Sequence, residues 1–135
     1  MSLVHTEIIL KNAKDLVLAE DGYKAETEVR QITVKALVDT GAWTLVINEE
    51  IREKLGLSVT GTGYGALANG VENEYDMAGP IELKWKDRRV LLDALVIPEA
   101  DSILLGAIPL EAMDLTINPR RELVVASKKE TKHFI

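Results

Sequence analysis

The sequence predicts one mainly β domain (all-β class) with one or two short helices. Its 135 residues suit a single domain that is long enough to bury a core. Short apolar segments alternate with turn-forming dipeptides along the chain, as expected for strands joined by hairpins. No internal repeat, low-complexity tract or linker divides the chain. We therefore predict a domain over residues 1–126 and a polar, frayed tail over residues 127–135.

The first expected elements are short strands at residues 7–10 and 16–19, followed by a turn at Asp21-Gly22. Another strand is predicted over residues 31–38. Apolar and polar residues alternate at its start and then give way to Ala36-Leu37-Val38. That change indicates a strand that runs into the interior of the domain.

A short helix is predicted over residues 49–55, after an extended segment at residues 45–47. Asn48 is a good N-cap, because its side chain can accept a hydrogen bond from an unpaired amide of the first turn. Two glutamates follow in that turn, and Gly56 supplies the usual stop.

The second half of the chain predicts two hairpins and a short helix. Asn69-Gly70 favours a tight turn because both central residues of a type I′ turn need positive φ. A second hairpin joins residues 81–85 to residues 90–97 through Lys86-Asp87-Arg88. The remaining expected elements are a strand at 102–105, a helix at about 109–113, a strand at 115–117, a turn at Asn118-Pro119 and a strand at 122–125.

The composition argues against several classes of function. With 16 basic and 22 acidic residues the net charge is −6, which does not favour contact with nucleic acid. The absence of cysteine excludes disulfides, thiolate catalysis and Cys-based zinc sites. His5 and His133 have no further ligand at metal spacing beside them. We therefore predict no metal and no cofactor.

Location is predicted from the lack of targeting signals. No apolar run approaches the roughly 18 residues that a membrane-spanning helix needs. The first ten residues lack the basic start and long apolar stretch of a secretory signal. The expected location is the cytoplasm, without a membrane partner.

The segment that carries chemistry is Val38-Asp39-Thr40-Gly41. Here an ionisable carboxylate directly follows a strand that is expected to be buried. Burial of a lone carboxylate is costly unless it finds hydrogen-bond donors, a cation or a proton shared with another acid. The Thr40 hydroxyl and the Gly41 amide are suitable donors. Taken alone, the tripeptide is also compatible with an ordinary turn that ends a strand.

The wider context resembles the retropepsin-like (retroviral-type, clan AA) aspartic proteases, in the form of a bacterial-type single-domain member. Three features carry the resemblance, which covers roughly residues 33–125. They are the apolar strand entering Asp39-Thr40-Gly41-Ala42 with Thr44-Leu45-Val46-Ile47 after it, the hairpin around Leu67-Ala68-Asn69-Gly70, and Ile103-Leu104-Leu105-Gly106 followed by a short helix and Leu115-Thr116-Ile117.

The resemblance implies a closed, barrel-like acid protease fold with one lobe per chain, and an aspartic endopeptidase activity. The sequence holds no second Asp-Thr-Gly or Asp-Ser-Gly, so the partner aspartate would be Asp39 of a second copy in a homodimer. Extended peptides or proteins would be the substrates. The implied roles are catalysis by Asp39, support of the carboxylate pair by Thr40 and Gly41, and substrate or flap contacts by Ala42, Leu67, Ala68, Asn69 and Gly70.

Two departures and one alternative accompany this resemblance. Ala107 follows Gly106 where viral members commonly carry arginine, and Ala42-Trp43-Thr44 lacks the aspartates that such an arginine pairs with. This combination indicates a different dimer interface, and we expect Trp43 to be a core or interface residue. The alternative function is a non-catalytic dimeric module that binds peptides or other proteins on the same fold.

Overall fold

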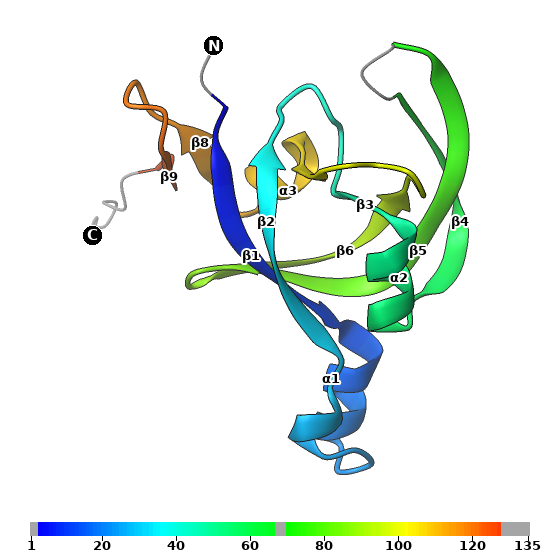
Figure 1. The fold of residues 1–135 in the computed structure, drawn as a ribbon. Coiled ribbons are helices and arrows are strands. Elements are labelled where there is room, and N and C mark those ends of the chain that lie inside the picture. Colours follow the sequence, from blue (N-terminus) through cyan, green and yellow to red (C-terminus); the bar gives the residue numbers. More distant parts are fainter. Residues whose placement is uncertain (1–2, 67–69, 128–135) are drawn as a thin grey trace.

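The computed structural model describes residues 3–66 and 70–127 and has a closed, mainly β architecture (Figure 1). The fold class is as predicted. The strands are β1 (His5–Asn12), β2 (Gln31–Val38), β3 (Val46–Ile47), β4 (Ser58–Ala66), β5 (Glu72–Trp85), β6 (Arg88–Val96), β7 (Ile103–Leu105), β8 (Leu115–Ile117) and β9 (Leu123–Val125). The helices are α1 (Ala13–Glu20), the 3₁₀ turn η1 (Glu26–Glu28), α2 (Glu49–Leu55) and α3 (Ala107–Ala112).

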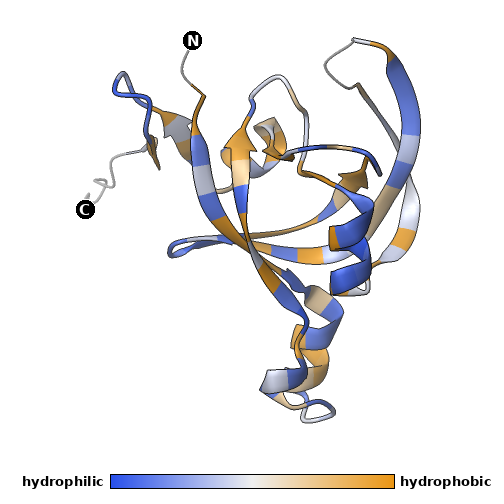
Figure 2. Cartoon of the chain, in the orientation of Figure 1, coloured by the Kyte–Doolittle hydropathy of each residue, from blue (hydrophilic) through white to orange (hydrophobic). Residues whose placement is uncertain are grey.

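Six strands close into a ring in the order β1-β2-β7-β3-β6-β5, and β5 pairs back with β1. The closing pairs include Leu10 with Leu83 and Asn12 with Ile81. β4 pairs with the first part of β5 outside the ring, and β8 and β9 form a separate two-stranded sheet. The ring encloses the core, in which the side chains of Leu10, Leu83 and Leu105 are fully buried. Figure 2 shows hydrophilic residues over much of α2 and at the start of β5.

The segment at residues 16–19 is helical, so the predicted strand there is wrong. α1 begins directly after β1 because the Asn12 side chain accepts a hydrogen bond from the Asp15 amide (3.1 Å). The other end of the Asn12 side chain donates to the Leu55 carbonyl, 2.8 Å away, and so ties α1 to the end of α2. A local pattern of apolar residues cannot reveal this long-range contact.

Helix α2 and its two ends are confirmed. Asn48 accepts from the Ile51 amide at 3.0 Å, and Gly56 ends the helix with φ of +63°. The predicted strand at residues 31–38 is also confirmed, as β2. The capping signals succeed here because each acts between residues that are close in sequence.

Both predicted hairpins are present, but they share one long strand. β5 pairs with β4 along its first part and with β6 along most of its length. Its register on β6 shifts between Ala78 and Ile81, where Gly79-Pro80 interrupts the regular ladder. Proline is accommodated at such an irregularity because it has no amide to donate. The predicted turn residues Leu67, Ala68 and Asn69 lie outside the described residues, as does the tail beyond residue 127.

The C-terminal elements follow the predicted order. α3 begins two residues earlier than expected, with Gly106 as its N-cap and Pro109 in its first turn, where a missing amide is tolerated. The predicted turn then joins β8 to β9. Within the described part of the chain, no helix is long and apolar enough to cross a membrane.

Candidate active site

Asp39 follows β2 at the point where that strand lies parallel to β7. Its amide donates to the Leu105 carbonyl at 3.0 Å, which continues the ladder by one residue and fixes the backbone. The Gly41 amide donates to Asp39 Oδ1 at 2.9 Å, and the Ala42 amide donates to the Asp39 carbonyl at 3.1 Å. The carboxylate is therefore held by the turn that follows it, and it is half-buried.

Helix α3 holds the loop that carries Asp39. The Ala107 amide donates to the Ala42 carbonyl at 2.8 Å, and the Ile108 amide donates to the Trp43 carbonyl at 3.0 Å. These two amides belong to the first turn of α3, where they have no partner within the helix. Gly106 allows the close approach, because a methyl group on it would lie 2.6 Å from the Ala42 carbonyl oxygen.

A cavity of about 450 Å³ opens beside Asp39. β2 and β3 contribute Leu37 and Val46 to its lining, and the end of β4 contributes Ala66. The rest of the lining comes from the segment before and within β7, namely Ile97, Glu99, Ala100, Asp101, Ser102 and Leu104. The walls are thus largely apolar, with a carboxylate at Asp39 and two more at Glu99 and Asp101. Such a cleft suits an extended chain with apolar side chains.

The structure brings together only some of the predicted site residues. Asp39, Thr40, Gly41 and Ala42 form one turn, in which Thr40 and Gly41 are exposed. Gly70 is exposed and has φ of +79°, but the predicted type I′ turn stays a prediction because its other central residue, Asn69, is not described. Leu67, Ala68 and Asn69 belong to the undescribed stretch, so their predicted substrate contacts stay a prediction.

Thr40 also borders a second cavity, of about 370 Å³, on the side of α3 and the β8–β9 sheet. Its other lining residues are mostly apolar: Ala107, Leu110, Glu111, Leu115, Thr116, Ile117 and Leu123. The Asp39 turn therefore lies between a cleft on one side and an apolar surface on the other.

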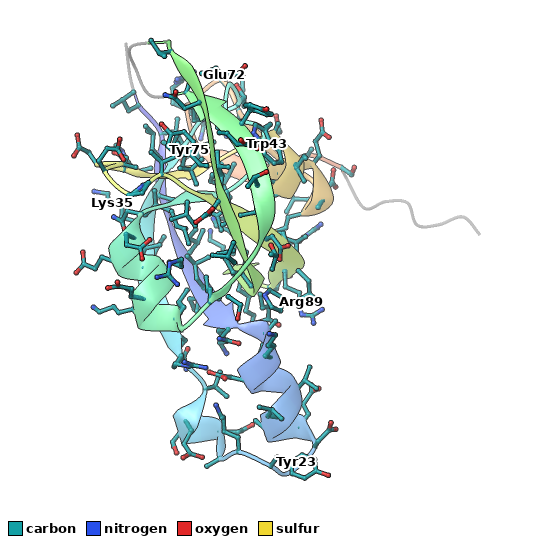
Figure 3. The ribbon with its side chains drawn as sticks, turned by 90° about the vertical axis from the view of Figure 1, so that its right-hand side faces the viewer. Tyr23, Lys35, Trp43, Glu72, Tyr75 and Arg89 are labelled. Atoms are coloured by element: carbon teal, nitrogen blue, oxygen red, sulfur yellow. The ribbon has the colours of Figure 1, made fainter. Side chains whose placement is uncertain are left out.

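Sequence reasoning missed the place of Trp43. The expectation of a core residue is wrong, since 42% of Trp43 is exposed; its place at an interface stays a prediction. Its indole N–H donates to the Tyr64 carbonyl of β4 at 2.7 Å. Figure 3 shows Trp43 beside the β4–β5 hairpin. The two residues are 21 positions apart, and no signal in the sequence links them.

No metal-binding group is formed by the described residues. Within residues 3–66 and 70–127, no three His, Asp or Glu side chains are grouped so that they could hold a metal ion.

Three solved structures are similar to this chain over most of its length, and the first two described here are used to define the fold. The retroviral protease-like domain of Ddi1 from Leishmania major is 17% identical, with a TM-score of 0.57 over 95% of this chain and 91% of that one. The EIAV protease in complex with the inhibitor HBY-793 is 19% identical, with a TM-score of 0.50 over 82% and 86%. A retropepsin-like aspartic protease from Rickettsia conorii is 22% identical, with a TM-score of 0.48 over 87% and 89%.

The first two likenesses, together with the closed ring and the Asp-Thr-Gly turn, define a retropepsin-like fold. The family model described as aspartyl protease matches residues 25–108, which is more than half of the sequence. The chain belongs to this aspartyl protease family. Comparison with curated protein sequences gives no match.

Proposed function

We propose that the protein is an aspartic endopeptidase that works as a homodimer. The observation that carries this proposal is the Asp39 turn, held by β7 and α3 and open to a cleft with largely apolar walls. Family membership supports the chemistry, and a single Asp-Thr-Gly per chain supports a site built from two copies.

In this mechanism the Asp39 carboxylates of two subunits face each other and share one proton, because two adjacent carboxylates do not both ionise easily. The ionised aspartate takes a proton from a water molecule as the water oxygen bonds to the carbonyl carbon of the substrate. The protonated aspartate gives its proton to the carbonyl oxygen. The carbon–nitrogen bond of the resulting tetrahedral species then breaks: the aspartate that took the proton from water gives it to the departing nitrogen, and the other aspartate takes a hydroxyl proton as the carbonyl re-forms. The pair again holds one proton.

The neighbours of Asp39 have supporting roles in this proposal. The Gly41 amide stabilises the ionised carboxylate through its hydrogen bond to Oδ1. Thr40, exposed beside the apolar surface of α3 and β8–β9, braces the two turns across the dimer axis. The β4–β5 hairpin covers the substrate and adds strand-like hydrogen bonds to it.

The test is cleavage of a diverse peptide library from acidic to neutral pH, with wild type compared with Asp39→Asn. We expect the variant to lose cleavage, and a transition-state-mimicking inhibitor of aspartic proteases to block the wild type. Asp101→Asn is the matched control, because Asp101 lines the same cavity without an Asp-Thr-Gly turn. Cleavage that survives in Asp39→Asn would contradict the assignment, and its simultaneous loss in Asp101→Asn would point to Asp101 instead.

A mixing experiment tests the shared site separately. When wild type is mixed with an equal amount of Asp39→Asn and the subunits exchange, random pairing halves the number of intact sites, so activity per wild-type chain falls to about half. An unchanged activity would show that each chain carries a complete site.

The alternative is a dimeric module that binds peptides without cutting them. It is favoured if neither wild type nor variant cleaves any peptide while the inhibitor or a peptide still binds. Binding is measured by calorimetry on the same protein samples.

A further inference from the structure

Trp43 links the loop that carries Asp39 to strand β4. Its backbone carbonyl accepts from the Ile108 amide of α3, while its indole N–H donates to the Tyr64 carbonyl of β4. One residue thus joins the loop that carries Asp39 to the arm that carries Ala66. Both Asp39 and Ala66 line the same cavity.

β4 is shaped to receive this side chain. A methyl group placed on Gly63 would lie 3.2 Å from Trp43 Cζ2, 3.0 Å from Met77 Sδ and 3.2 Å from Leu95 Cδ1. The indole ring therefore lies against the backbone of β4 at a place without a side chain. On the same strand, a methyl group on Gly61 would meet no atom within 4 Å. Gly65 lies against Leu95 and Ile97 instead, so Gly63 is the glycine of β4 that the Trp43 ring approaches, together with Met77 and Leu95.

β4 is an edge strand whose backbone pairs on one side only, with a further hydrogen bond from Thr60 Oγ1 to Asp93 Oδ2 of β6 at 2.9 Å. β4 pairs with β5 and is the last strand in the order of the sheet. Its residues are mostly exposed, in contrast to the buried end of β5. The indole hydrogen bond links β4 to the loop that carries Asp39, and it would restrict how far β4 moves from that loop.

We propose that Trp43 is a positioning residue that sets the spacing between the Asp39 loop and the β4 arm, and thereby controls how tightly a peptide is held. It acts through β4 and the loop and takes no part in proton transfer. The kinetic consequence rests on the proposed function, whereas the structural consequence does not.

The first test is Trp43→Phe, which keeps a ring and removes the N–H donor. Trp85→Phe is the matched control: the Trp85 indole donates to Thr6 Oγ1 at 2.8 Å, and Trp85 is 5% exposed on the ring of strands. We expect Trp43→Phe to speed amide hydrogen exchange of residues 58–66 by about fivefold, as the loss of one hydrogen bond implies. Trp85→Phe should leave exchange of that segment unchanged.

The second test is kinetic. Trp43→Phe should raise KM by about three- to tenfold and leave kcat within about twofold, because the lost contact holds ground state and transition state alike. A fall in kcat with an unchanged KM would overturn the positioning role. If the wild type cleaves nothing, the proposed function fails, and the exchange measurement and the fluorescence test below decide the structural part of this inference.

The third test displaces the Trp43 ring by adding a methyl group to β4. In the Trp85→Phe background Trp43 is the single remaining tryptophan, so its fluorescence reports on its own surroundings. Gly63→Ala should shift its emission to the red and raise quenching by acrylamide, whereas Gly61→Ala should do neither. Unchanged emission in Gly63→Ala, together with unchanged β4 exchange in Trp43→Phe, would overturn the inference.

Discussion

At the scale of single residues, the most buried charge of the described chain lies far from Asp39. The Asp15 side chain is 1% exposed and accepts hydrogen bonds from Lys24 Nζ at 2.8 Å and from Arg30 Nε at 2.9 Å. The Arg30 amide donates to it as well, at 3.0 Å. One carboxylate therefore joins α1 to the two segments that follow it. A buried carboxylate with this many donors stays ionised at neutral pH.

Replacing Asp15 by asparagine should destabilise the protein by about 1–3 kcal/mol, because charge-assisted hydrogen bonds are lost within a buried site. The change is measured by urea unfolding at neutral pH. Glu49→Gln is the control: Glu49 pairs with Arg52 at a partly exposed place on α2, and its loss should cost less than about 1 kcal/mol. Equal effects of the two substitutions would contradict the special role of Asp15.

The same residue predicts how stability depends on pH. Hydrogen bonds from the Arg30 side chain, and further ones from Lys24 and the Arg30 amide, hold the pKa of Asp15 far below its usual value despite the opposing effect of burial. The unfolded chain therefore takes up a proton at a higher pH than the folded protein does. The contribution of Asp15 to the free energy of unfolding is therefore complete above about pH 5, and it is lost progressively as the pH falls below about 4.

Urea unfolding at several pH values checks this dependence. The free energy of unfolding of the wild type should fall more steeply between about pH 5 and pH 3 than that of Asp15→Asn. If the free energy of unfolding falls equally steeply with pH in both proteins, Asp15 is not the source of the pH dependence.

Residue patterns in the sequence locate Asp39 but leave the rest of the cleft unassigned. Asp39, Thr40 and Gly41 are adjacent, so their shared turn can be predicted from their order alone. Glu99 and Asp101 reach the cavity only because β7 lies beside β2, and Trp43 reaches Tyr64 only across the cleft. Contacts of this kind depend on the complete fold.

At the scale of elements, the two α-helices of the first half differ in how far local signals specify them. α2 has a side-chain cap at one end and a glycine with positive φ at the other, both adjacent to the helix. α1 depends on Asn12, whose side chain also donates a hydrogen bond to the distant Leu55 carbonyl. It depends as well on the ion pair between Asp15 and Arg30. Sequence patterns therefore predict α2 with correct bounds and mistake part of α1 for a strand.

The junction between β7 and α3 yields a prediction about the site as a whole. Gly106→Ala should lower the free energy of unfolding by about 1–3 kcal/mol, because its methyl group would meet the backbone of Ala42 and Thr44. It should also lower kcat/KM by displacing the Asp39 loop. Gly61→Ala, where the methyl group meets open space, is the control for both measurements. If Gly106→Ala is as stable as the wild type, the backbone of Ala42 and Thr44 can move away from the added methyl group at little cost in free energy, and the prediction is wrong.

At the scale of the whole molecule, closure of the ring depends on the pairing of β1 with β5, whose partners are about seventy residues apart. The alternation of apolar residues predicts the strands and the mainly β class, but it carries no information about which strand lies beside which. The expectation of a closed barrel came from the family resemblance of three separated motifs. The sequence does not predict the full length of β5, because Gly79-Pro80 resembles a break between two separate strands.

A dimer with a shared site predicts that protein concentration and inhibitor both affect thermal stability. Tm should rise with protein concentration, and it should rise further with a transition-state-mimicking inhibitor, since each stabilises only the assembled form. Differential scanning calorimetry over a hundredfold range of concentration provides the measurement. Asp39→Asn serves as the comparison and should keep the concentration dependence but lose most of the response to inhibitor. A Tm independent of concentration would argue against a dimer that dissociates on unfolding.

The α1–η1 segment projects from the end of the ring opposite the Asp39 loop (Figure 1). Figure 3 shows Tyr23 at the lower end of the molecule and Trp43 in its upper half, and a methyl group on Gly22 would meet no atom within 4 Å. That turn is therefore a suitable attachment point for a dye or for a tether to a surface. A label there would leave the cleft accessible, so cleavage and subunit exchange could be followed on immobilised single molecules.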